Sequence, residues 1–183
     1  ALAATLDPVA GREKLSAALR RATAVEDIPG FCDDLDDVAS RLGRAGAGGR
    51  RAGSLTRSEV VRFGAGLRAI EVRDAVWIAV DEGCLGSEQL WRELARRLPS
   101  PYDAAPLFLL GWTAFRTGSG ALANIACDRA LASDPDYSAA ELLVVAVSRG
   151  VDPRRLPSLR AAGVVADDAP ENNAPEDDEV GGG

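Results

Sequence analysis

The sequence contains no histidine and no methionine, and only three cysteines among its 183 residues. The lack of histidine excludes Ser-His-Asp and Cys-His nucleophilic catalysis, histidine acid–base chemistry and every zinc site with an imidazole ligand. Cys32, Cys84 and Cys127 lie far apart and form no Cys-x-x-Cys pair, which favours a reducing compartment over a disulfide framework. We therefore expect a cytoplasmic protein with no catalytic residues, no metal and no cofactor.

Long apolar runs are missing as well. The longest, Ala75–Val80 and Leu142–Val147, are far shorter than the ~20 residues that a membrane span requires. The N-terminal segment is interrupted by Asp7 and Pro8, so it lacks the apolar core of a signal peptide. We expect no membrane insertion, and we expect Ala1 to be a processed end or the edge of a fragment.

Charge is unevenly distributed along the chain. Lys14 is the single lysine among 21 basic residues, and this compositional bias weakens any functional interpretation of arginine density. The formal net charge of −7 arises from the segment 166–183, which contains acids and no base, so the rest of the chain is formally neutral. A polar, acidic segment with proline cannot bury a core, and we predict a disordered acidic tail over 163–183.

Elsewhere the apolar residues recur at helical spacing, and no stretch alternates as a strand does. We expect N-terminal helices over about Gly11–Ala24 and Asp33–Leu42, with Pro29-Gly30 as a break between them. The segment Gly43–Gly53 has no apolar residue larger than alanine, and its glycines make ordering costly. It predicts a flexible linker rich in glycine and arginine.

Later segments carry start and stop signals for helices. Thr56 and Glu59 have capping-box spacing, in which each side chain bonds the backbone N–H of the other. Ser87 can cap another helix, which Pro99 ends. The helices expected after Thr56 cover about 57–70, 72–82, 88–98, 104–116, 120–133 and 138–149.

One stretch of the last third resembles a known repeat. Asp103–Asp136 is similar to one tetratricopeptide repeat, a 34-residue pair of antiparallel helices that meet through small residues. The matching positions are Leu110-Gly111, Ala123, Ala130 and Pro135, and the departures, where aromatic residues are expected, are Leu107, Ala114 and Cys127. Residues 70–101 resemble a more degenerate preceding unit, since Pro101 lies 34 residues before Pro135, although Trp77 stands where glycine is expected.

The resemblance implies an all-α fold in which helical hairpins stack as a short TPR-like α-solenoid array. The organisation that we predict has four parts: N-terminal helices over 1–42, a flexible linker over 43–54, a helical-repeat-like domain over 55–162 and the acidic tail over 163–183.

A wider resemblance covers most of the chain. It rests on four runs, Val72–Ala75, Leu90–Arg97, Pro101–Leu107 and Arg129–Tyr137. These runs are similar to the C-terminal half of an actinobacterial protein family of unknown function, whose members are longer and carry an N-terminal α/β half. The resemblance implies lineage and architecture, and no activity.

The helix expected over 104–116 is apolar on two sides. Its small residues form one stripe, and its aromatic residues form a second stripe on roughly the opposite side. The repeat resemblance assigns the small residues to the partner helix. It places four side chains on the concave side, where such repeats hold extended peptides or helices: Phe108, Trp112, Phe115 and Arg116. Aromatic residues and arginine dominate binding hot spots. The alternative is that the preceding helices simply cover the rings.

Other motifs have simpler explanations than a ligand site. The acidic run Asp33–Asp37 lacks the alternating ligands and central glycine of a calcium loop, and acids are expected at a helix start. The segment Gly43–Gly53 follows a helix and ends in arginines, so it is not a Walker phosphate loop. The surrounding region is basic, but no aromatic residue is interleaved before Phe63, and we do not expect nucleic-acid binding.

Two classes of function remain. The first is a protein–protein interaction module that binds a protein or peptide on a TPR-like concave face. The second is an accessory C-terminal domain of an enzyme whose catalytic N-terminal half is absent from this chain. The lack of histidine and of any catalytic constellation favours the first, and we expect no enzymatic activity from this chain alone.

Overall fold

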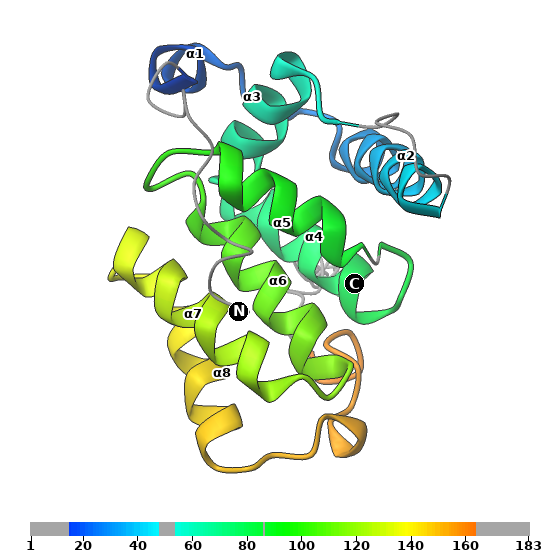
Figure 1. Ribbon diagram of the computed structural model, residues 1–183, viewed down its shortest axis with the longest axis vertical. Helices are drawn as coiled ribbons and strands as arrows, with labels where there is room; N and C mark the ends of the chain where they lie inside the picture. Colours follow the sequence, from blue (N-terminus) through cyan, green and yellow to red (C-terminus); the bar gives the residue numbers. More distant parts are fainter. Residues whose placement is uncertain (1–14, 48–53, 86, 164–183) are drawn as a thin grey trace, which may run out of the picture.

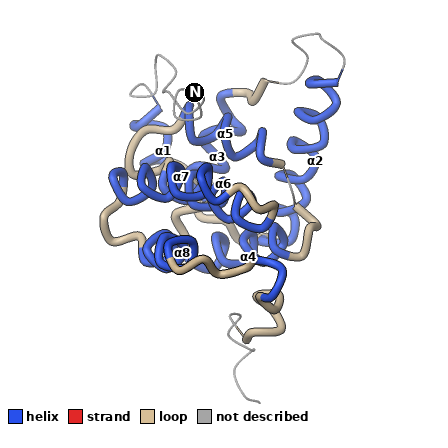
Figure 2. The backbone as a smooth tube through the Cα atoms, turned by 60° about the horizontal axis from the view of Figure 1, so that its bottom comes forward, coloured by secondary structure: helices blue, strands red, loops and turns tan. Residues whose placement is uncertain are grey.

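The computed structural model describes residues 15–47, 54–85 and 87–163, and these residues are helical and contain no strand (Figures 1 and 2). The predicted all-α class is therefore confirmed. The helices are α1 (Ser16–Arg21), α2 (Ile28–Ala47), α3 (Arg57–Gly66), α4 (Ile70–Asp81), α5 (Glu88–Arg97), α6 (Ala104–Arg116), α7 (Gly120–Ser133), α8 (Ser138–Ser148) and the 3₁₀ helix η3 (Pro153–Arg155). Half of the predicted linker, residues 48–53, and nearly all of the predicted tail lie outside the described residues.

Helix α2 is longer at both ends than the sequence predicts. Pro29 was expected to break the chain, but it lies in the first helical turn, where its missing N–H has no helical partner to lose. The Asp27 carboxylate accepts a hydrogen bond from the Gly30 backbone N at 2.9 Å and caps this turn. At its other end α2 continues to Ala47, so the first residues of the predicted linker are helical.

The predicted caps of α3 and α5 are present. Thr56 Oγ1 accepts a hydrogen bond from the backbone N of Glu59 at 3.2 Å, and the Thr56 backbone N donates to Glu59 Oε2 at 2.7 Å. Ser87 Oγ accepts from the backbone N of Leu90 at 3.2 Å. These bonds satisfy N–H groups that the first turn of a helix leaves without a partner.

Helix α6 lies at the centre of the fold and contacts α4, α5, α7 and α8 (Figure 1). Eleven of its 13 residues are buried, as expected for a helix that is apolar on all sides. Its closest neighbour is α7, to which it is joined by a tight turn with Gly118 at φ 84°. A Cβ at Gly111 would lie 2.8 Å from Cys127 Sγ, so glycine permits the close approach of these two helices.

Helices α4 and α6 run side by side in the same direction. The Trp77 ring meets the Phe108 ring at 4.8 Å near the middle of both helices. Trp77 also meets the Trp112 ring at 5.1 Å, and one turn beyond this pair Asp81 meets Arg116 at 3.0 Å. Because later residues of α4 contact later residues of α6, the two helices are parallel.

The N-terminal helices pack onto the same core. Phe31 of α2 is fully buried and meets the Phe63 ring of α3 edge-on at 5.6 Å. A Cβ at Gly66 would lie 2.5 Å from the Phe31 ring, so the ring is closely enclosed. Leu35 and Leu42 extend the same buried stripe along α2.

Replacing Phe31 with alanine should therefore lower the free energy of unfolding of the full chain by about 3–5 kcal/mol, since the cavity lies in the shared core. Urea denaturation followed by far-UV circular dichroism measures this loss. Leu142→Ala is the matched control, because Leu142 is 69% exposed and its truncation should change stability by less than about 0.5 kcal/mol. A loss below about 1 kcal/mol for Phe31→Ala would contradict a single core.

Candidate functional site

A buried carboxylate stands at the end of α4. The side chain of Asp81 is 0% exposed, and its Oδ1 lies 3.0 Å from Arg116 Nε and accepts a hydrogen bond from Trp112 Nε1 at 3.2 Å. Its Oδ2 accepts a hydrogen bond from the backbone N of Leu159 at 2.8 Å. A negative charge at the C-terminal end of a helix opposes the helix dipole, and a buried charge is costly unless paired. Asp81 therefore depends on donors from two other parts of the chain.

Arg116 connects the end of α6 to the segment that follows α8. Besides its ion pair with Asp81, its Nη1 donates a hydrogen bond to the backbone carbonyl of Pro153 at 2.9 Å. The guanidinium also lies over the Trp112 ring, 6.0 Å from its centroid. Only 26% of the Arg116 side chain is exposed. The guanidinium is thus held by a carboxylate, an aromatic face and a backbone carbonyl.

We call residues 151–163 the C-terminal strap. After α8 the chain turns at Gly150, which has φ 66°, and the strap then passes the C-terminal ends of α4 and α6 (orange in Figure 1). Its Leu159 side chain is buried, and Leu156 packs partly against the core. Arg160 Nε pairs with Glu82 Oε1 at 2.6 Å. The strap contains the one-turn helix η3 and is otherwise non-helical.

The strap is therefore held as a bound peptide would be. Side chains of the helices hold one of its backbone carbonyls and one of its backbone N–H groups, and one leucine side chain is buried. Backbone bonds of this kind fix the direction of a bound segment, while side-chain pockets give specificity.

The structure corrects the predicted open aromatic face of α6. Phe108, Trp112 and Phe115 are buried, because α4 places Trp77 against them, edge-on to the Phe108 and Trp112 rings at 4.8 and 5.1 Å. The structure instead has the alternative arrangement from the sequence analysis, in which a preceding helix covers the rings. Of the four predicted residues, Arg116 alone keeps partial exposure and contacts a segment that lies across the helix ends.

Sequence reasoning missed Asp81 and the strap. The Asp81 carboxylate follows the apolar run Ala75–Val80 directly, so an acid at the C-terminal end of a buried helix was a visible signal. Leu156 and Leu159 lie between polar and proline residues, which was the sign that this segment returns to the core. Neither signal identifies its partner, because the partners are distant in the sequence.

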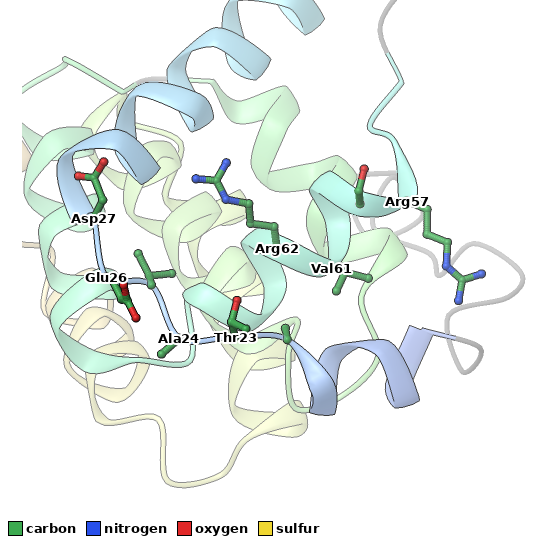
Figure 3. A pocket seen from close by; sticks show the side chains of 10 residues that line it. Thr23, Ala24, Glu26, Asp27, Arg57, Val61 and Arg62 are labelled. Carbon is green, nitrogen blue, oxygen red and sulfur yellow. The ribbon is translucent and has the colours of Figure 1, made fainter.

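A hollow lies between the connection from α1 to α2 and the start of α3 (Figure 3). It has a volume of about 780 Å³, and its walls are formed by residues 22–27 and by Arg57, Ser58, Val61 and Arg62. Its charged groups are used by the fold, since Arg62 pairs with Asp34 and Asp27 caps α2. The hollow presents no nucleophile with an adjacent base.

Two arginines of the basic region that was considered for nucleic acid form ion pairs. Arg41 Nη2 lies 2.7 Å from Glu59 Oε1, and Arg62 pairs with Asp34. Burial alone would raise the pKa of Glu59, but hydrogen bonds from Thr56 and Arg41 outweigh it and hold this pKa below its ordinary value. The Glu59 carboxylate is therefore charged at neutral pH and compensates Arg41. Arg50 and Arg51 lie outside the described residues.

The described part of the chain offers neither a metal site nor a membrane span. No group of three or more cysteine, aspartate and glutamate side chains comes together there as metal ligands would, and no helix there is long and apolar enough to cross a membrane. Burial, with a smaller effect of Asp128, raises the pKa of Cys127 to about 12, so this thiol is not a nucleophile at neutral pH.

Comparison with known families gives one match. The family model described as "Domain of unknown function (DUF4192)" matches residues 1–154, which include α1–α8 and the first residues of the strap. Searches of the curated proteins and of the solved structures found no match.

Replacing Asp81 with alanine should lower the free energy of unfolding by about 3–5 kcal/mol, because the guanidinium of Arg116, most of whose side chain is covered, would lose its counter-charge. Urea denaturation of the full chain measures the loss. Glu82→Ala is the matched control, since this neighbouring acid forms an exposed pair with Arg160 and its loss should change stability far less than the loss of Asp81. Equal losses for the two variants would contradict the central role of Asp81.

The three thiols should react in a fixed order with a thiol reagent at pH 8. The exposed Cys84 should react first, and the buried Cys127 should stay unmodified until the chain unfolds, because its raised pKa leaves almost no thiolate. Mass spectrometry of the labelled protein assigns each site. Early modification of Cys127 would contradict its place between α6 and α7.

Proposed function

Because the chain belongs to the DUF4192 family, a family of unknown function, we propose its role from geometry: it is a module that binds a segment of a protein or peptide. The binding groove is formed by the C-terminal ends of α4 and α6. Asp81 accepts a hydrogen bond from a backbone N–H of the ligand, and Arg116 donates a hydrogen bond to a backbone carbonyl of the ligand. The observation that carries the proposal is the way these two side chains hold the backbone of the strap.

The helix arrangement supports a TPR-like reading of this groove. In tetratricopeptide arrays the first helices of successive 34-residue units lie side by side and line the concave face. Helices α4 and α6 run parallel, and α8 follows α7 and packs on both α7 and α6. Trp77 and Gly111 lie at equivalent positions of α4 and α6 when the chain is aligned at that period. The groove that we propose therefore lies on the side where such arrays hold their ligands.

The chemistry of the groove suits binding rather than catalysis. Its polar groups are one carboxylate, one guanidinium and one indole N–H, and all three are used to orient one another. Because the carboxylate and the guanidinium are paired with each other, this geometry favours an interaction module over an enzyme.

Selection of random linear peptides displayed on phage, using the intact full chain as the target, tests the proposal. Selected peptides should bind at least about tenfold more weakly to Arg116→Ala, because one charge-assisted bond to their backbone is lost. Arg149→Ala is the matched control, since Arg149 is an exposed arginine at the end of α8.

Circular dichroism and urea denaturation establish that both variants are folded before binding is compared. Failure to select any peptide even with the full chain carrying Leu159→Asp, whose residues 151–163 cannot bury their leucine at the groove, or equal binding of the selected peptides to folded Arg116→Ala and to the unchanged chain, would refute the proposed groove.

A further inference from the structure

The strap occupies the groove that the proposed function assigns to a partner. We infer that the strap is an intramolecular competitor, and that the partner it excludes is a peptide that follows the same course and presents a leucine followed by a basic residue, as Leu159-Arg160 does. This inference rests on the proposed function, and it adds what the partner resembles and how its access is regulated.

The contacts of the strap define the ligand chemistry. Leu159 has a buried side chain, and its backbone N–H donates a hydrogen bond to Asp81. The groove therefore contacts both the side chain and the backbone of this leucine. The next residue, Arg160, pairs with Glu82 on the exposed rim of the groove. The carbonyl of Pro153 meets Arg116 at the other end of the groove. A partner therefore needs a backbone carbonyl at the position of Pro153, in a helical turn, and a leucine-arginine pair at the positions of Leu159 and Arg160.

The strap is attached by few interactions compared with the helices around it. Its Leu159 is buried, but the side chains of Arg154, Arg155 and Arg160 are exposed. The pair of Arg160 with Glu82 contributes little, because exposed ion pairs are weak. Segments with few buried apolar contacts open at a lower free energy than the core. The strap can therefore leave while α4 and α6 stay folded.

The family comparison agrees with a separable strap. The match to the family ends at residue 154, so Asp81 and Arg116 lie inside it, whereas Leu159 and Arg160 lie beyond it. The two sides of the contact thus belong to different parts of the chain: the groove to the family domain, and the leucine-arginine pair to the segment that follows.

The affinity that this arrangement requires can be bounded. A segment tethered next to its site has an effective concentration on the order of 1 mM. For the strap to be bound at least about ten times more often than free, a separate peptide of the same sequence must bind the open groove with a Kd at or below about 0.1 mM.

The probe is a fluorescent synthetic peptide of residues 151–163, and the target is the full chain carrying Leu159→Asp, which cannot bury its own strap. We expect this chain to bind the peptide with a Kd at or below about 0.1 mM, and the unchanged chain to bind it at least about tenfold more weakly, because its groove is occupied. Leu142→Asp is the matched control, since it adds the same charge at an exposed leucine of α8 and should behave as the unchanged chain.

The outcomes separate the inference from the proposed function. Equal peptide binding to the two chains, or none to a folded Leu159→Asp chain, overturns the strap as competitor. If phage-selected peptides still require Arg116 in that case, the binding groove stands without this regulation. If those peptides are also absent, both proposals fail.

A second measurement needs no variant. Hydrogen exchange of the unchanged full chain should show the Leu159 amide exchanging at least about tenfold faster than the slowest amides of α6, with little dependence on added urea, because the strap opens locally. Exchange of that amide only through global unfolding, with the same urea dependence as α6, would overturn the inference even if Leu159→Asp failed to fold.

Discussion

The buried carboxylate of Asp81 is the interaction on which the rest of this structure depends. It terminates α4 at a point where the helix dipole disfavours negative charge, so its burial is tolerated only with donors around it. Those donors come from α6, through Trp112 and Arg116, and from the backbone of Leu159. One acid thereby fixes the register of two parallel helices and the path of the chain after α8.

The second constraint is the apolar character of α6. A helix without a polar face must be covered on every side, and α6 is covered by α4, α5, α7 and α8. Gly111 lets α7 approach closely, and Trp77 closes the opposite side. The polar side chains at the C-terminal ends of α4 and α6 hydrogen-bond the backbone of the strap, and for this reason we place the binding groove there.

The local parts of this fold follow from the sequence. The predicted bounds of α6 and α7 agree with the structure because glycine, proline and helical periodicity act within a few residues. The proposed break at Pro29 was wrong because proline is tolerated in a first turn, a distinction that depends on Asp27 as the cap. Burial of the α6 aromatic rings was one of two alternatives that the sequence left open, and the choice between them required the position of Trp77 in another helix. Arg116 was identified as a site residue, but its partners Asp81 and Pro153 required the fold.

The central claim is that the groove binds the backbone N–H of a peptide segment through the carboxylate of Asp81. Its most direct test replaces the Leu159 amide by an ester in the peptide 151–163, which removes the N–H and keeps the side chain. Isothermal titration of the two peptides into the full chain carrying Leu159→Asp compares their affinities. The account predicts that the ester binds about tenfold or more weakly, as expected for the loss of a hydrogen bond to a buried carboxylate. Equal affinities of the two peptides would contradict it.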